Sequence, residues 1–178
     1  MLNDTKIIDL KRNNYTQFFP NLFLPQSTDI FNTEINNTET RIKYHQYDGL
    51  CNPLSVSIEG GSKVNYIWSY GGQHPVAQIL NVDYATMEEI IGALNIASIG
   101  VQLNPDKTVI DNLLAPLKAS MPSIQIMTFT YYPLGDIKTI TDAKGMVTYY
   151  EYDEFQRLKV IKDQNGNIVK SYDYHYKL

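Results

Sequence analysis

The sequence predicts a mainly β protein made of antiparallel hairpins in a curved sheet, with a two-helix hairpin inserted between two β blocks. Strands are indicated where apolar and polar residues alternate, as in the segment 54–58, which has the period of a half-buried strand. The stretch 85–121 differs, because it contains no aromatic residue in a chain that is 12% aromatic and its apolar residues recur at helical spacing. The chain has 178 residues, enough for about one domain with its own core.

These patterns divide the chain into segments. Residues 1–40 are predicted to be an N-terminal arm or edge strands, because Pro20 and Pro25 interrupt an aromatic cluster and proline cannot donate to a central ladder. Within this segment, the Asn- and Thr-rich stretch 32–40 is expected to be a loop. The other segments are a first β block at 41–84, the helical hairpin at 85–122 and a second β block at 123–178.

Capping signals place the ends of the two expected helices. Thr86 and Glu89 have the spacing of a capping box, in which each side chain bonds a free amide at the helix start. The pair Asn104-Pro105 is typical of the start of the second helix. We expect Pro116 to bend or end that helix about one turn early, because its ring clashes with the carbonyl of the preceding turn.

A repeated pattern links the two β blocks, a tyrosine followed fourteen residues later by a glycine. It occurs at Tyr47 and Gly61, at Tyr131 and Gly145, and at Tyr152 and Gly166. The last two copies start 21 residues apart, and each has an aspartate three residues before its glycine, Asp142 and Asp163. A D-x-x-G tetrapeptide favours a type I turn whose glycine is left-handed and whose aspartate caps local amides. The fixed period predicts one small structural unit that was copied and that packs against its neighbours.

The most complete copy begins at Tyr152-Asp153, continues through Asp163 and Gly166, and is followed by a second Tyr-Asp pair at 172–173. This pattern resembles the YD repeat, also called the RHS repeat. The resemblance covers about the last 50 residues and, less closely, residues 44–70. A segment such as Tyr66-Ile-Trp68-Ser-Tyr70, followed by a helical hairpin and then the repeats, also resembles the C-terminal part of YD-repeat proteins of Bacteroidetes-type bacteria.

The copies depart from the family pattern at single positions. Cys51 and Gln156 stand where the family has a glycine, and Tyr132 stands where it has the aspartate. The resemblance implies strands wound into a long spiralling sheet that can close around a cargo polypeptide, and a secreted or cell-surface location. The DPxG motif of related toxin cores is missing from this sequence, so the resemblance does not extend to self-cleavage or toxin delivery.

Composition and charge exclude several classes of function. The formal net charge is −4 and Lys and Arg do not cluster, so the sequence lacks the basic footprint of a nucleic-acid-binding protein. The sequence contains no run of 18 apolar residues, so we do not expect insertion into a membrane. The first ten residues lack the apolar core of a signal peptide. The residues by themselves leave the cellular location unknown.

The sequence predicts no metal site, no cofactor and no catalytic residue. Cys51 is the only cysteine, which excludes an intrachain disulfide and a multi-cysteine metal site. His45, His74 and His175 lack metal-ligand spacing. No set of nucleophile, base and orienting residue can be assembled, so we do not expect an enzyme.

Two hypotheses about function follow. The first is a non-catalytic structural or interaction module, part of a YD-repeat sheet that pairs with further repeats or with itself through its sheet edges. Its structural positions are Tyr47, Gly61, Tyr131, Asp142, Gly145, Tyr152, Asp153, Asp163 and Gly166. The alternative is a surface domain that binds a glycan or another polymer through exposed aromatic residues, Tyr66, Trp68 and Tyr70.

Overall fold

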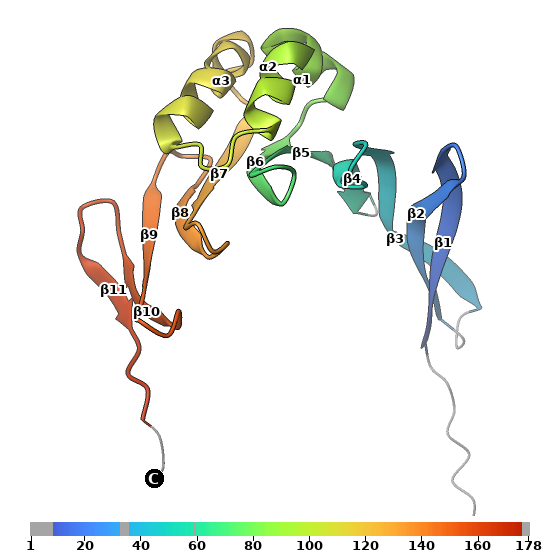
Figure 1. Ribbon diagram of the computed structural model, residues 1–178. Coiled ribbons are helices and arrows are strands. Elements are labelled where there is room, and N and C mark those ends of the chain that lie inside the picture. The colour runs from blue at the N-terminus through green and yellow to red at the C-terminus, as the bar shows by residue number, and fades with distance from the viewer. Residues whose placement is uncertain (1–8, 33–35, 59, 176–178) are drawn as a thin grey trace, which may run out of the picture. The chain divides into compact units, whose positions relative to one another are not determined.

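The structure is a computed structural model that describes residues 9–32, 36–58 and 60–175 (Figure 1). Its strands form one 11-stranded sheet in which the order in space is the order along the chain. The strand pairs with a described register are antiparallel, which confirms the prediction of a mainly β fold. The chain divides into two compact units, Met1–Asn65 with Asn81–Tyr84, and Tyr66–Leu80 with Ala85–Leu178.

The first unit contains the N-terminal strands. These are β1 (Asp9–Phe19), β2 (Leu22–Asn32), β3 (Asn37–Tyr47), β4 (Pro53–Ile58) and the start of β5 (Lys63–Ser69). Pro25 lies in β2, which has β1 and β3 as neighbours and is not an edge strand. The strand accommodates this proline because it lies at a register shift opposite Tyr15, and the pairing of β2 with β3 starts only at Ser27.

The loop predicted for residues 32–40 is wrong at Asn32, the last residue of β2, and from Asn37 onward, where β3 begins. Thr38 and Thr40 pair with Phe31 and Asp29 of β2. Threonine is β-branched and suits a strand once a partner strand is in place, and that partner is not visible in local composition. Residues 33–35 of the predicted loop, like residues 1–8 of the predicted arm, lie outside the described residues.

The second unit contains the end of β5 and the remaining strands. These are β6 (His74–Leu80), β7 (Gln125–Tyr131), β8 (Ile137–Thr141), β9 (Val147–Tyr152), β10 (Leu158–Lys162) and β11 (Ile168–Ser171). β6 and β7 are direct neighbours, with Leu80 opposite Gln125. The helical segment lies between these two strands in sequence, so it is an insertion between sheet neighbours.

The insertion contains α1 (Tyr84–Ile91), α2 (Ala93–Gly100) and α3 (Lys107–Ser120) in place of the two helices expected. The first expected helix is broken at Gly92, which has a φ of 93°. That backbone conformation favours glycine. A Cβ atom at this position would also lie 3.1 Å from Asn95 Nδ2, so a larger residue would crowd the break.

The helix ends also differ from the sequence prediction. Thr86 lies inside α1 and not at its start. α3 is capped by Asp106 and not by Asn104, and the Asp106 carboxylate accepts a hydrogen bond from Val109 N at 2.9 Å. α3 continues through Pro116 to Ser120, so this proline does not end the helix early.

The core of the second unit is built from both helices and strands. Its most buried apolar side chains include Ile67, Val76, Ile79, Met87, Ile99, Ile110, Leu114 and Leu117. The burial of each one contributes roughly 1.5–3 kcal/mol. Figure 1 shows the three helices lying together beside β6 and β7. By contrast, no residue of β9, β10 or β11 is buried, so the helical layer protects only the strands near the insertion.

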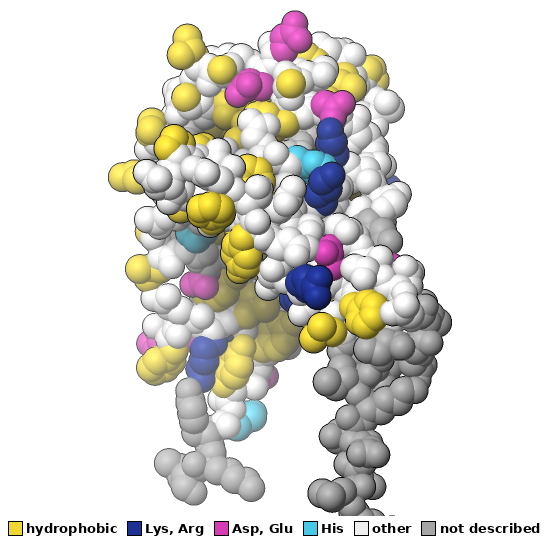
Figure 2. Space-filling view, turned by 90° about the vertical axis from the view of Figure 1, so that its right-hand side faces the viewer, with side chains coloured by type: hydrophobic (Ala, Val, Ile, Leu, Met, Phe, Trp, Pro, Cys, Tyr) yellow, Lys and Arg dark blue, Asp and Glu magenta, His cyan; other side chains and the backbone are white. Residues whose placement is uncertain are grey.

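The surface carries few charges, in keeping with the composition of 15 Lys and Arg against 19 Asp and Glu. On the face shown in Figure 2, the charged side chains stand singly or in small groups, with both signs interspersed among polar and apolar ones. None of the helices in the described ranges is both long and apolar enough to cross a bilayer.

Candidate functional site

The tetrapeptide Asp142–Gly145 forms a tight turn between β8 and β9. Gly145 N donates to Asp142 O at 2.9 Å, and Asp142 N donates to Met146 O at 3.0 Å. The Asp142 carboxylate oxygen Oδ1 accepts from the backbone amides of Lys144 and Met146, each at 2.9 Å. Gly145 closes the turn with a φ of 85°. The side chain of the aspartate thus satisfies amides that the strands leave unpaired.

The same turn recurs at Asp163, Asp153 and Asp48. In each copy Oδ1 of the aspartate accepts from the amides two and four residues later, at 2.8–2.9 Å. The left-handed position is filled by Gly166 with a φ of 82°, by Gln156 with 60° and by Cys51 with 68°. The Tyr-Asp and D-x-x-G halves of the sequence pattern are therefore one structural motif.

A fifth copy lacks the carboxylate. At Tyr132 the backbone bonds are kept, since Gly135 N donates to Tyr132 O at 2.9 Å and Tyr132 N donates to Asp136 O at 2.8 Å. Gly135 has a φ of 99°. Turns starting at residues 132, 142, 153 and 163 connect consecutive strands from β7 to β11, so they alternate between the two ends of the antiparallel strands.

The tyrosine before a turn forms a hydrogen bond from its hydroxyl to the backbone of the preceding strand. The hydroxyl groups of Tyr47, Tyr131 and Tyr152 donate to backbone carbonyls at 2.8, 2.8 and 3.1 Å. The acceptors are Pro25 O in β2, Pro75 O in β6 and Ile137 O in β8, respectively. The repeated tyrosine therefore has a structural role that the sequence pattern alone does not reveal.

Burial changes the acidity of these tyrosines. Desolvation raises the pKa of Tyr47 to about 12, with smaller contributions from nearby Tyr44 and Cys51. Desolvation, with a smaller contribution from Tyr70, also raises the pKa of Tyr131 to about 12. Both residues remain neutral hydrogen-bond donors well above physiological pH.

Gly61 does not share the conformation of the other repeat glycines. Its amide donates to Ile58 O at 2.8 Å, but the left-handed residue in this turn is Gly60, with a φ of 64°. The spacing of fourteen residues from Tyr47 to Gly61 therefore does not correspond to the same turn as at Gly145 and Gly166.

The three aromatic residues proposed for ligand contact do not form one exposed platform. Tyr66 and Trp68 are half-buried on β5, with ring centroids 6.4 Å apart. Tyr70 is only 6% exposed, and its hydroxyl accepts from Tyr131 N at 3.0 Å. Tyr70 also packs edge-on against Tyr131 and His74. It belongs to a packed aromatic cluster, at a position where the backbone has a φ of 55°.

The histidines and Cys51 have local contacts or are exposed. His45 Nε2 lies 2.8 Å from Ser57 Oγ, and the ring of His74 stacks on Tyr131 at 4.5 Å. His175 and Cys51 are exposed. Within the described ranges, His, Cys, Asp and Glu side chains form no group of three or more that could hold a metal ion.

No family model and no curated protein sequence matches this chain. Solved structures with a similar arrangement include three crystal structures of TcdB2-TccC3: without the hypervariable C-terminal region, with Cdc42, and as TcdB2-TccC3 itself. Their TM-scores are 0.47, 0.47 and 0.45, at 17%, 16% and 16% identity. The match covers 93%, 93% and 90% of this chain, but the chain spans only 7%, 8% and 7% of the length of those structures.

Proposed function

We propose that this chain is a non-catalytic segment of a YD-repeat (RHS-repeat) β-sheet whose role is to pair with further strands at its edges. One observation carries the proposal. Aspartate-capped turns of one geometry alternate along consecutive strands, and among the described strands the last of them, β11, is an exposed edge. A copied unit of this kind buries its surface only against neighbouring copies.

β11 has the properties of a strand that accepts a partner. Among the described strands it pairs only with β10. Each of its residues is exposed, and Ile168 and Val169 are 63% and 66% exposed. An exposed apolar edge presents unpaired backbone groups and apolar side chains together, which is a template for strand addition.

The repeat register continues past β11. Tyr172 and Asp173 occupy the positions that Tyr152 and Asp153 have in the preceding copy, and Tyr172 N donates to Lys159 O at 2.9 Å. The hydroxyl of Tyr174 donates to Leu158 O at 2.8 Å, as other tyrosines of the repeats bond to carbonyls. This supports a further repeat strand in the position beside β11.

The proposal extends to the narrower resemblance and to location. The helical insertion ahead of the C-terminal repeats supports the resemblance to the C-terminal part of YD-repeat proteins of Bacteroidetes-type bacteria. Such a scaffold would act in a secreted or cell-surface assembly.

The test is whether the β11 edge drives association. We expect the isolated chain to associate as its concentration rises, measured by sedimentation velocity. In the double variant Ile168→Lys with Val169→Lys, the added charges oppose edge pairing, so we expect a monomer at the same concentrations.

A matched control replaces two exposed leucines that lie away from the edge. Leu94 in α2 is 86% exposed and Leu103 is 77% exposed, so Leu94→Lys with Leu103→Lys adds the same charge elsewhere. It should associate like the wild type, with folding checked by circular dichroism. A wild-type chain that stays monomeric at high concentration, or a β11 variant that associates normally, would sink the proposal.

Binding of a glycan is the second candidate, favoured by the adjacent rings of Tyr66 and Trp68 on β5. Trp68 is the only tryptophan in the chain, so its fluorescence reports on this position alone. We expect soluble oligosaccharides to change that fluorescence in a saturable way if the rings stack on sugars. An unchanged spectrum across the oligosaccharides tested would rule out this position as the binding surface.

A further inference from the structure

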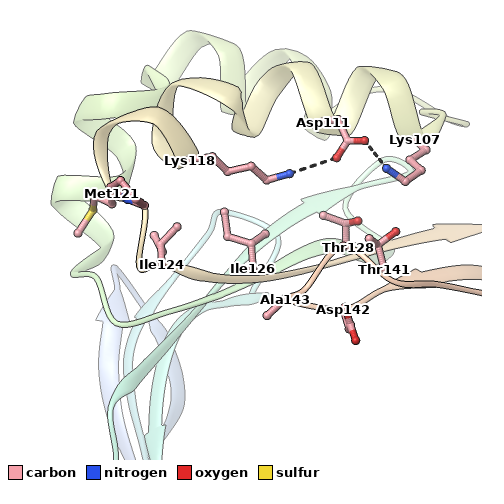
Figure 3. Close-up of a pocket in the computed structure, with 12 residues that line it drawn as sticks. Lys107, Asp111, Lys118, Met121, Ile124, Ile126, Thr128, Thr141, Asp142 and Ala143 are labelled. Atoms are coloured by element: carbon pink, nitrogen blue, oxygen red, sulfur yellow. Dashed lines mark hydrogen bonds and ion pairs between the residues drawn. The ribbon is translucent and has the colours of Figure 1, made fainter.

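A pocket of about 380 Å³ lies inside the second unit, between α3 and the strands β7 and β8 (Figure 3). Its roof carries the side chains of Lys107, Asp111 and Lys118 from α3. Its floor includes Thr128 of β7 and Thr141 of β8, whose side chains rise toward the helix in Figure 3. Polar and charged groups thus face each other across a space large enough for a small molecule.

The roof has more positive than negative charge. The Asp111 carboxylate bonds to both lysines, through Oδ2 to Lys107 Nζ and through Oδ1 to Lys118 Nζ at 3.4 Å. Burial by itself raises the pKa of Asp111, but the hydrogen bonds and charges of the two lysines outweigh it and lower the pKa below its usual value. One ionised carboxylate is therefore bonded to two ammonium groups, which leaves an excess of one positive charge.

The only other acid that lines the pocket, among the residues described, is committed elsewhere. Asp142 points away from the roof in Figure 3, and its Oδ1 accepts from the amides of Lys144 and Met146. Its Oδ1 belongs to the turn, and the bond described for each lysine is the one to Asp111, so each ammonium group has N–H donors beyond that bond.

Helix stability does not explain this placement of charge. Lys107 is the first residue of α3, where the helix dipole disfavours a cation. The Lys107–Asp111 pair has the lysine four residues before the acid, which is the less favourable order on a helix. A lysine at the start of α3 becomes favourable if an anion lies beneath it.

The floor contains a buried hydroxyl group without a partner. Thr141 is 8% exposed, and its Oγ1 has no hydrogen-bond partner within the part of the chain that the structure describes. Leaving a buried polar group unpaired is unfavourable. Oγ1 itself is shielded from solvent, so a rotation of the Thr141 side chain would bring it to a ligand oxygen between the floor and the roof.

We propose that the pocket binds a small oxyanion of the phosphate class, held by Lys107 and Lys118 from above and by the Thr141 hydroxyl from below. Ammonium groups and hydroxyls are the donors that phosphate oxygens accept from in proteins. The volume leaves room beside the phosphate for an organic substituent, so both free phosphate and a phosphate monoester fit. This site is independent of the scaffold role proposed above.

The test is a calorimetric titration of the full chain with inorganic phosphate and with a phosphate monoester, in chloride buffer of low ionic strength. We expect saturable binding to the wild type. Lys118→Met should weaken it by about tenfold, because one charge-assisted hydrogen bond is lost. Lys144→Met removes the same charge from the exposed neighbouring turn and should leave the affinity nearly unchanged.

Two further variants separate binding from folding. Asp111→Asn releases both lysines and should tighten phosphate binding, opposite to the effect of Lys118→Met. Thr141→Val should weaken binding by about tenfold while the ligand-free protein is no less stable, because the unpaired hydroxyl is gone. Tighter binding of the monoester than of free phosphate would identify the organic source.

Three results would overturn the proposal. The first is a wild-type chain that shows no saturable heat with either compound. The second is an equal loss of affinity in Lys144→Met and Lys118→Met, which would show attraction by surface charge alone. The third is weaker binding in Asp111→Asn, which would mean that the carboxylate itself, and not the lysine excess, maintains the site.

Discussion

The residue three positions after each turn aspartate determines how well the turn suits the chain. Gly145 and Gly166 adopt φ values of 85° and 82° there, without a side chain to clash. Cys51 and Gln156 adopt 68° and 60° at the equivalent positions, where an L side chain costs about 1–2 kcal/mol. The copies without glycine are therefore strained versions of the same turn.

Replacing Gln156 with glycine should stabilise the protein. Gln156→Gly relieves about 1–2 kcal/mol of backbone strain in the folded state. The greater freedom of glycine in the unfolded chain opposes this gain by about 0.4–1 kcal/mol. We expect a net gain of roughly 0.5–1 kcal/mol in the free energy of unfolding, measured in urea. Glu154 lies in the same turn and does not have a positive φ, so Glu154→Gly is the matched control and should be destabilising. A Gln156→Gly variant less stable than the wild type would contradict the strain.

The buried tyrosines before the turns should make stability depend on alkaline pH. The pKa of Tyr131 is about 12 in the folded protein, above its ordinary value of 10.0, so the folded state holds its proton more tightly than the unfolded state. The stabilisation is complete below pH 10 and is lost as the pH rises from 10 toward 12. The difference corresponds to about 2–3 kcal/mol.

This dependence is measured by urea unfolding at a series of alkaline pH values. In Tyr131→Phe, the decline of the unfolding free energy across this range should be shallower than in the wild type. Comparison at neutral pH isolates the lost hydrogen bond to Pro75 O, which we expect to cost about 1 kcal/mol. Identical alkaline profiles for the two proteins would show that Tyr131 does not titrate as proposed.

At the scale of elements, α3 shows how packing overrides a local breaker. Pro116 removes one amide donor from the helix interior, yet α3 continues to Ser120. Ile110, Leu114 and Leu117 lie on one face of α3 and are fully buried. Their burial offsets the cost of the proline, so the sequence signal for a helix end is not followed.

Pro116→Ala should therefore stabilise the protein. The substitution restores an amide that can donate to Asn112 O and removes a steric clash, and we expect a gain of about 1–3 kcal/mol. Urea unfolding with circular dichroism measures both stability and helix content. Pro122 lies beyond the end of α3, so Pro122→Ala gains no helical hydrogen bond and should not be stabilising. A gain of equal size in both variants would point to a general effect of removing proline.

At the scale of the whole molecule, neighbours in the sheet are neighbours in sequence, except that the helices are inserted between β6 and β7. Among the described strands, those at the two ends of the sheet have a strand neighbour on one side only, and such edges can accept a further strand. Within β11 the only charged residue is Lys170. The proposed pairing at this edge would therefore depend on backbone hydrogen bonds and apolar contacts.

Edge pairing of this kind should be insensitive to salt. Screening weakens interactions between exposed charges but has little effect on backbone hydrogen bonds or apolar contacts. We expect the association constant from sedimentation to change little between low and high ionic strength. Dissociation at high salt would indicate that charged side chains, and not the β11 edge, hold the copies together.

Patterns among nearby residues are enough to predict the β blocks, the turns at Asp142 and Asp163 and the position of the helical insertion. The equivalence of Asp48 and Asp153 with these aspartates is less visible. The same aspartate is present, but Cys51 and Gln156 stand where the glycine signal is expected.

Local chemistry in the sequence by itself determined strand alternation, helical spacing and turn-forming tetrapeptides, because each depends on residues close together in the chain. Only the tertiary structure decided that Tyr70 is buried against Tyr131, that β3 begins at Asn37, and that Lys107 and Lys118 lie above Thr141. These outcomes depend on which distant segments pack together, and a burial partner many residues away leaves no mark on the local pattern.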